Sequence, residues 1–132
     1  MTKGLRQAVY DKFGGLCAYT GQPLGTDWQV DHMKPKCNWQ WHQLWNTEDI
    51  DDLQNLLPAI KIINHYKRGN HLEGFRASML TFHLRLAKLP KKTQRQQTVR
   101  RIAYMRQIAD LFGITLEKPF SGKFYFETRN QK

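Results

Sequence analysis

The hydrophobic positions in the first third of the chain predict a short helix followed by two strands. One set of apolar residues lies near helical spacing, namely Leu5, Ala8, Val9, Tyr10 and Phe13. Gly14 and Gly15 then supply a stop. Residues 16–19 and 29–33 both have the pattern of a strand, and the Gly-Gln-Pro-Leu-Gly segment between them is typical of a turn. The pattern therefore predicts a hairpin whose second strand ends near Asp31 and His32.

The middle of the chain combines an aperiodic stretch with a strand and a helix. Residues 34–53 show no periodicity, so we expect a long loop there. The apolar run Leu56–Ala59 predicts a short strand, and Ile60–Arg68 can form a helix that ends at Gly69 and Asn70.

The C-terminal half is predicted to be helical. Leu72–Leu89 and Thr98–Phe112 both carry apolar residues at helical spacing, and Pro90 closes the first of these segments. The aromatic cluster within Phe120–Glu127 is typical of a strand. The pattern as a whole predicts an α+β fold with an N-terminal helix, two C-terminal helices and a final short strand.

Length and charge restrict the class of protein. The 132 residues suit one domain with a modest core, so we expect a single domain over 1–132. Lys and Arg outnumber Asp and Glu by 21 to 11, and the formal net charge of +10 favours a polyanionic partner, above all nucleic acid. No window approaches the about 18 consecutive apolar residues of a membrane span, and the first residues lack the apolar centre of a signal peptide. We expect a soluble, cytoplasmic protein that binds no membrane.

Polar residues at the ends of the predicted strands indicate hydrolytic chemistry. Asp31 and His32 end one strand, Asn55 precedes the next, and Asn64 and His65 lie in the helix that follows. A carboxylate and a carboxamide can share one hard cation with water and a phosphate. An imidazole beside them can accept a proton from the attacking water, because it is largely neutral at physiological pH.

Successive blocks of the sequence resemble small stand-alone HNH endonucleases of bacteria and their phages. The blocks are Lys-Phe-Gly-Gly-Leu-Cys-Ala-Tyr-Thr-Gly, Gln-Val-Asp-His-Met-Lys-Pro-Lys, Asn-Leu-Leu-Pro, Asn-His-Tyr-Lys-Arg-Gly, Leu-Glu-Gly-Phe-Arg and Phe-Tyr-Phe-Glu. The Asp-His pair alone would be a weak signal, whereas the ordered set is strong. The resemblance implies a ββα-metal core over about residues 15–70 and a helical C-terminal extension over about residues 71–132.

The same resemblance implies a metal-dependent endonuclease that hydrolyses phosphodiester bonds of DNA. Asp31 and Asn64 would bind one catalytic Mg²⁺ or Mn²⁺. His32 would be the general base, and Asn55 would fix the loop that carries it. His65 competes with Asn64 for the ligand position, because adjacent helix residues diverge by about 100° and are poor partners for one metal. We favour Asn64, since an oxygen ligand suits a hard cation better than an imidazole does.

The chain departs from the family at its structural zinc site. Many relatives bind zinc through two Cys-x-x-Cys pairs, and the corresponding positions here are Cys17, Thr20, Ile60 and Ile63. The two isoleucines are expected to bury apolar surface where the metal was, each contributing about 1.5 to 3 kcal/mol if fully buried. We therefore predict no structural zinc, and free thiols at Cys17 and Cys37.

Basic residues predict where DNA binds. Lys67 lies three residues after Asn64, on nearly the same helix face, from which it could reach a phosphate. From Arg85 to Arg106 the chain has eight basic residues and no acidic one, which favours a surface that follows the phosphate backbone. The DNA-binding candidates are Lys67, Arg68, Lys91, Lys92, Arg95, Arg100 and Arg101.

Two alternative functions use the same residues. A catalytically weak DNA-binding module of this fold is one, and the complete motif argues against it. A toxin-type nuclease is the other, and it would usually need a delivery or immunity-binding region for which 132 residues leave little space. Restriction, phage DNA processing, homing and bacterial defence against phage are all compatible with the chain, as are partner proteins and any oligomeric state.

Overall fold

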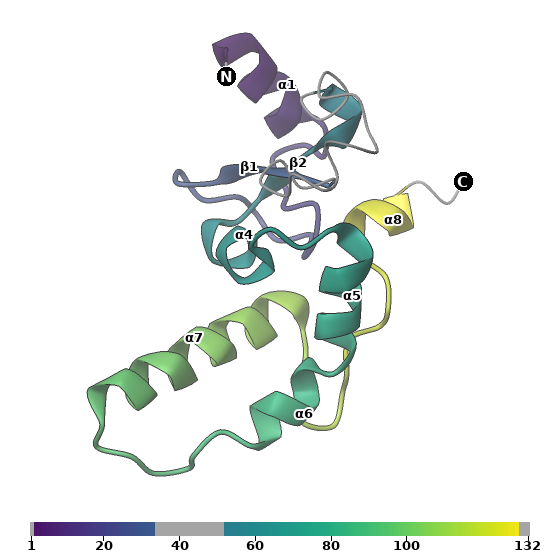
Figure 1. Ribbon diagram of the computed structural model, residues 1–132. Helices are drawn as coiled ribbons and strands as arrows, with labels where there is room; N and C mark the ends of the chain where they lie inside the picture. Colours follow the sequence, from purple (N-terminus) through teal and green to yellow (C-terminus); the bar gives the residue numbers. More distant parts are fainter. Residues whose placement is uncertain (1, 34–51, 130–132) are drawn as a thin grey trace. The chain divides into compact units, whose positions relative to one another are not determined.

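The computed structural model describes residues 2–33 and 52–129, and the fold is α+β. The chain forms two compact units (Figure 1). The first contains residues 2–33, 52–75 and 124–129, and the second contains residues 76–123. Cys37 and nearly all of the predicted loop over residues 34–53 lie outside the described residues. The single domain over 1–132 stays a prediction.

The first unit begins with α1 (Lys3–Asp11), which packs on the sheet. Thr2 caps the helix, because its hydroxyl oxygen accepts a hydrogen bond from an amide of the first turn. Val9 is fully buried in a cluster with Trp28 and Leu56. The N-terminal helix predicted from the sequence is therefore present, and its apolar face anchors the flank of the strands.

The sheet has two antiparallel strands among the described residues. β1 (Gln29–His32) pairs with β2 (Leu56–Ala59), which follows the 3₁₀ helix η1 (Leu53–Asn55). His32 lies opposite Leu56, and Gln29 lies opposite Ala59. The predicted hairpin between residues 16–19 and 29–33 is therefore wrong, because the partner of β1 comes from much later in the chain.

Residues 16–23 form a tight loop in place of the predicted first strand. The amide of Cys17 donates to the carbonyl of Gln22 at 2.8 Å, and only an isolated bridge joins Leu16 to Pro23. The amide of Ala18 donates to the carbonyl of Pro58 on β2 at 2.8 Å. All four residues of β2 are buried. The local pattern of polar and apolar residues shows which segments can form strands, but it does not show which distant segment pairs with β1.

The helix α4 (Lys61–Lys67) follows β2 after one residue, Ile60. Ile63 is completely buried and Ile60 is partly buried, so the two isoleucines do contribute to packing. The order β1, β2, α4 gives the strand–strand–helix succession that Figure 1 shows within the first unit. This succession is compatible with a ββα core.

The end of the chain returns to the first unit as a helix. α8 (Tyr125–Arg129) replaces the strand predicted over Phe120–Glu127, which is wrong. The amide of Phe124 donates to Oε1 of Glu127 at 2.9 Å, and this contact caps the helix. Phe124 and Phe126 are buried with their rings against Tyr19. Packing and capping therefore override the β propensity of the aromatic residues.

The predicted helix over Leu72–Leu89 is divided in the structure. α5 (Leu72–Leu80) ends before Thr81, and α6 (Phe82–Ala87) begins after it. The guanidinium of Arg85 donates to Oγ1 of Thr81 at 2.6 Å and to the carbonyl of Ser78 at 2.7 Å. Side chains that bond to the helix backbone compete with its regular ladder, which explains the break.

The second unit is completed by α7 (Gln96–Phe112), which packs against α6. Gly113 follows α7 and has a φ of 72°, in the left-handed region. Helices often end at a residue in this conformation, and glycine adopts it without steric cost.

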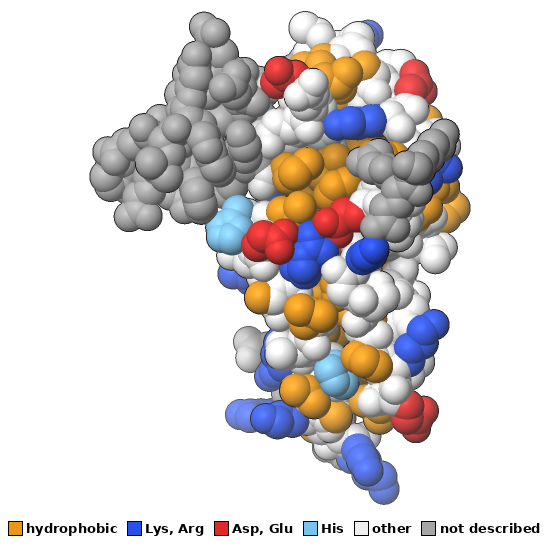
Figure 2. All heavy atoms as spheres, turned by 90° about the vertical axis from the view of Figure 1, so that its right-hand side faces the viewer, with side chains coloured by type: hydrophobic (Ala, Val, Ile, Leu, Met, Phe, Trp, Pro, Cys, Tyr) orange, Lys and Arg blue, Asp and Glu red, His pale blue; other side chains and the backbone are white. Residues whose placement is uncertain are grey.

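None of the helices formed by residues 2–33 and 52–129 has the length and apolar character needed to cross a membrane. Figure 2 shows Lys and Arg side chains spread over one face of the molecule, where they are more prominent than acidic ones.

Candidate active site

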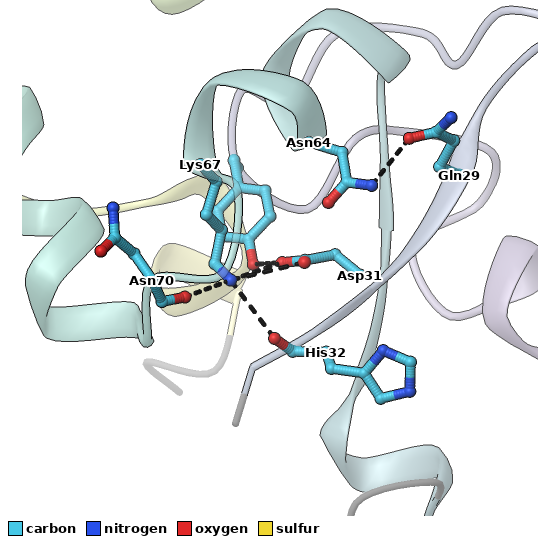
Figure 3. Close-up of polar contacts among 7 residues, drawn as sticks. Gln29, Asp31, His32, Asn64, Lys67 and Asn70 are labelled. Carbon is cyan, nitrogen blue, oxygen red and sulfur yellow. Dashed lines mark hydrogen bonds and ion pairs between the residues drawn. The ribbon is translucent and has the colours of Figure 1, made fainter. Parts of the chain in front are cut away.

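Two neighbouring residues of β1, Asp31 and His32, are the central candidates for the predicted chemistry. Alternation along a strand places Asp31 and His32 on opposite faces. Figure 3 shows the carboxylate of Asp31 turned toward α4 and the imidazole of His32 turned the other way. Asp31 is buried, with 6 % of its surface exposed, whereas His32 is partly exposed. The imidazole can therefore meet solvent while the carboxylate is held inside the protein.

Two buried side chains bind the carboxylate of Asp31. The ammonium nitrogen of Lys67 lies 3.1 Å from Oδ2 and 3.4 Å from Oδ1. The hydroxyl of Tyr19 donates a hydrogen bond to Oδ2. Lys67 and Tyr19 each expose 1 % of their surface. Burial of a charged pair is tolerated when the charges are paired and hydrogen-bonded, as they are here.

Lys67 also binds two backbone carbonyl groups. Its ammonium donates to the carbonyl of His32 at 3.3 Å and to the carbonyl of Asn70 at 2.7 Å. The lysine side chain therefore ties the end of β1 to the turn that follows α4, since it binds the side chain of Asp31 and the backbone of His32.

The position of Lys67 corrects one prediction. The sequence placed Lys67 where it could reach a DNA phosphate, but the structure buries the side chain against Asp31. A helix residue three positions after Asn64 does face the sheet, and there its ammonium meets the carboxylate of Asp31. Arg68 is exposed, so it stays a candidate for DNA contact.

The pKa values of the buried groups follow from their surroundings. Burial raises the pKa of Asp31 above its ordinary value, although the charge of Lys67 and the hydrogen bond from Tyr19 oppose this effect. Burial, followed by the negative charge of Asp31, raises the pKa of Tyr19 well above its ordinary value. Tyr19 therefore remains protonated and acts as a neutral donor to the carboxylate.

Asn64 lies on the face of α4 that meets β1. Its Nδ2 donates to Oε1 of Gln29 at 2.7 Å, and Gln29 is two residues before Asp31 on the same strand face (Figure 3). The bond from Nδ2 leaves the carbonyl oxygen of Asn64 on the other side of its carboxamide. His65 is exposed on the surface of α4. Which of Asn64 and His65 binds a metal stays a prediction.

Asn55 lies at the end of the sheet where His32 is found. It is buried, and its carbonyl accepts a hydrogen bond from the amide of Met33 at 2.9 Å. Its own amide donates to the carbonyl of Asp52 at 2.8 Å. Asn55 is thereby joined through its carbonyl to the residue that follows His32 and through its amide to the start of η1.

The donor atoms suit a hard divalent cation. One carboxylate and one carboxamide oxygen leave most ligand positions to water and phosphate, which is how Mg²⁺ is commonly bound. No group of three or more His, Cys, Asp or Glu side chains with metal-site geometry occurs within residues 2–33 and 52–129. A cation at Asp31 would have to share or replace the contacts that Lys67 makes.

The DNA-binding residues predicted in the C-terminal half are exposed. All five of these candidates lie in the second unit, namely Lys91, Lys92, Arg95, Arg100 and Arg101. Within that unit a groove of about 370 Å³ is lined by residues 90–94 and by side chains of α7 that include Arg106. The second unit thus has accessible cations beside a concave surface.

Tyr19 is the residue of the site that the sequence reasoning missed. It lies within the Leu-Cys-Ala-Tyr-Thr-Gly block that carries part of the resemblance, but nothing in that block indicates a carboxylate partner.

Comparisons of the chain with protein-family models, curated proteins and solved structures found no match. The function is therefore inferred from the residues and their geometry.

Proposed function

We propose that this protein is a metal-dependent HNH endonuclease, built on a ββα-metal core, that hydrolyses phosphodiester bonds of DNA. The observation that carries the proposal is that the motif residues lie on and around one strand, β1. Asp31 and His32 end β1, and Asn55 bonds to the residue after them. Asn64 reaches the same strand from α4 through Gln29.

The residues divide the chemistry between the two faces of β1. Asp31 and the carbonyl oxygen of Asn64 would hold Mg²⁺ or Mn²⁺, which supplies charge neutralisation at the phosphate and at the leaving oxygen. His32 takes the proton of the attacking water from the opposite face. Lys67 and Asn55 keep the end of the strand in place, since Lys67 binds the carbonyl and Asn55 the amide of the peptide group that joins His32 to Met33.

Support for DNA as the substrate comes from charge. The formal net charge is +10, and the basic residues of the second unit are accessible to a phosphate backbone. Contacts of this kind position a duplex without reading its sequence.

One observation favours a second candidate, a catalytically weak DNA-binding module of the same fold. The ammonium of Lys67 already compensates the charge of Asp31, so the carboxylate gains less free energy from binding a metal. The two candidates agree on DNA binding and differ in cleavage.

A cleavage assay separates them. Supercoiled, linear and single-stranded DNA are incubated with the protein in Mg²⁺, in Mn²⁺ and in EDTA, and the products are resolved on one gel. An endonuclease nicks or linearises the supercoiled substrate in a metal-dependent manner, and His32→Ala abolishes the products. Binding without any metal-dependent product would favour the second candidate instead.

A further inference from the structure

The ammonium of Lys67 has the surroundings of a bound cation. Its contacts are all to oxygen: both carboxylate oxygens of Asp31, the carbonyl of His32 and the carbonyl of Asn70 (Figure 3). The side chain is almost completely buried, although it comes from the last residue of α4. A carboxylate and two carbonyls are the donors that also bind hard metal ions.

The turn after α4 supplies one of the oxygen contacts of Lys67, and it requires a strained backbone conformation at Arg68. Arg68 has a φ of 55° and a ψ of −138°, a region that glycine adopts readily and arginine does not. The amide of Asn70 donates to the carbonyl of Lys67 at 3.3 Å, which closes a four-residue turn. The turn brings the carbonyl of Asn70 to the ammonium, and Asn70 itself is exposed.

We infer that Lys67 is an internal counter-ion that holds Asp31 in the metal-free protein, and that a divalent cation binds by displacing it. Metal binding is then an exchange of one cation for another on the same carboxylate. The inference rests on the proposed function, because it takes Asp31 as a metal ligand. It adds that Lys67 sets the metal concentration at which the site fills.

Exchange follows from charge repulsion at a buried site. An ammonium and a divalent cation on one carboxylate would lie within a few ångströms of each other, where the low effective dielectric makes their repulsion large. Tyr19 brings no charge, so its hydrogen bond to Asp31 can persist beside either cation. Asn70 is exposed, so the turn that carries its carbonyl lies at the surface of the protein.

Metal-binding affinity tests the exchange directly. Binding of Mn²⁺ is measured by calorimetry for the wild type, for Lys67→Met and for Lys61→Met. Lys61 is exposed on the same helix and provides the matched loss of one positive charge. Lys67→Met should bind Mn²⁺ about tenfold more tightly or better, in the range usual for coupled binding, and Lys61→Met should bind like the wild type. Lys67→Gln, which keeps a donor to Asp31, replaces the methionine variant if that variant does not fold.

Labelling of amines in the unaltered protein provides a second measurement. The protein is treated with an acylating reagent with and without Mn²⁺, and modification of each lysine is followed by mass spectrometry. Lys67 should be protected without the metal and become reactive with it, while Lys61 should react equally in both conditions. Protection of Lys67 that persists in saturating Mn²⁺ would overturn the inference.

The outcomes distinguish this inference from the proposed function. Equal or weaker Mn²⁺ affinity in Lys67→Met would refute the exchange while leaving the endonuclease proposal intact. No detectable Mn²⁺ binding in any of the variants would overturn both. Binding that appears only once Lys67 is neutralised would be the strongest form of the expected result.

Discussion

The ammonium nitrogen of Lys67 lies 3.1 Å from Oδ2 of Asp31, and both side chains are buried. Removing one partner of such a pair leaves an uncompensated charge inside the protein, which usually costs about 3 to 5 kcal/mol. Lys67→Met should therefore lower the free energy of unfolding by about that amount in the absence of metal, as measured by urea denaturation. Asp31→Asn in the same background should recover part of the loss, and an unchanged unfolding midpoint in Lys67→Met would show that the pair is not formed in solution.

The stability of Lys67→Met should also depend on pH. Burial already raises the pKa of Asp31, and loss of the lysine charge removes the largest influence that opposes the rise. A carboxyl group whose pKa is raised on folding is most compatible with the folded state when protonated, so its stability contribution is lost as pH rises. The deficit relative to wild type should be small at about pH 4, near the ordinary pKa of Asp, and should grow toward neutral pH. Thermal melts of both proteins across this range give the comparison, and a deficit that stays constant with pH would contradict the prediction.

His32→Ala should lose cleavage by at least about 10²-fold, the lower end of what a general base contributes. DNA affinity should stay near wild type, because the imidazole serves the chemical step. Lys61→Ala, a change at an exposed residue of α4, is the control and should retain turnover. Single-turnover kinetics at saturating protein gives the comparison, and retained cleavage in His32→Ala would remove His32 from the proposed role.

Metal dependence should identify the ligands. Asp31→Ala and Asn64→Ala should both require more Mg²⁺ or Mn²⁺ for cleavage, since each removes an oxygen donor. Circular dichroism of each variant controls for folding, which matters for Asp31 because Lys67 depends on it. If His65→Ala raises the metal requirement and Asn64→Ala does not, His65 is the ligand and the choice of Asn64 is wrong.

Chelation should stop cleavage without unfolding the protein. Ile63, at one of the positions where the resemblance to HNH endonucleases would place a zinc ligand, is completely buried, so packing is expected to serve in place of a structural metal. Elemental analysis should find no stoichiometric zinc, and the melting temperature should be unchanged in EDTA. One zinc per chain, or a melting temperature that collapses on chelation, would overturn this expectation.

Salt dependence should locate the DNA surface. For duplex DNA, the logarithm of the binding constant falls with the logarithm of the salt concentration with a slope of about −0.9 for each phosphate contact. Replacing Lys91, Lys92 and Arg95 together by Ala should make the slope shallower and weaken binding to unrelated sequences alike. The double variant Lys118→Ala, Lys123→Ala removes exposed lysines of the same unit and is the control. A slope that does not change in the triple variant would place the DNA contacts elsewhere.

Several elements could be predicted from the sequence because their signals are local. Helical spacing and a stop signal located α1 and α7 within a few residues of their observed bounds. The buried run of β2 and the helix after it were predicted for the same reason. The break at Thr81 was not, because it depends on hydrogen bonds that Arg85 makes from the next helix. Residues 125–129 were assigned to a strand from their aromatic composition, whereas packing against Tyr19 and the Glu127 cap decided for a helix.

The sequence by itself determined the residue types that carry the proposed chemistry and their order along the chain. Asp31, His32, Asn55 and Asn64 can all be selected without knowledge of any contact. Only the tertiary structure decided that β1 pairs with β2, that Tyr19 donates to Asp31 and that Lys67 is an internal cation. The physical reason is that periodicity reports how a segment is exposed along its own axis. Pairing of strands and compensation of a buried charge depend on groups that are distant in the chain and become neighbours only on folding.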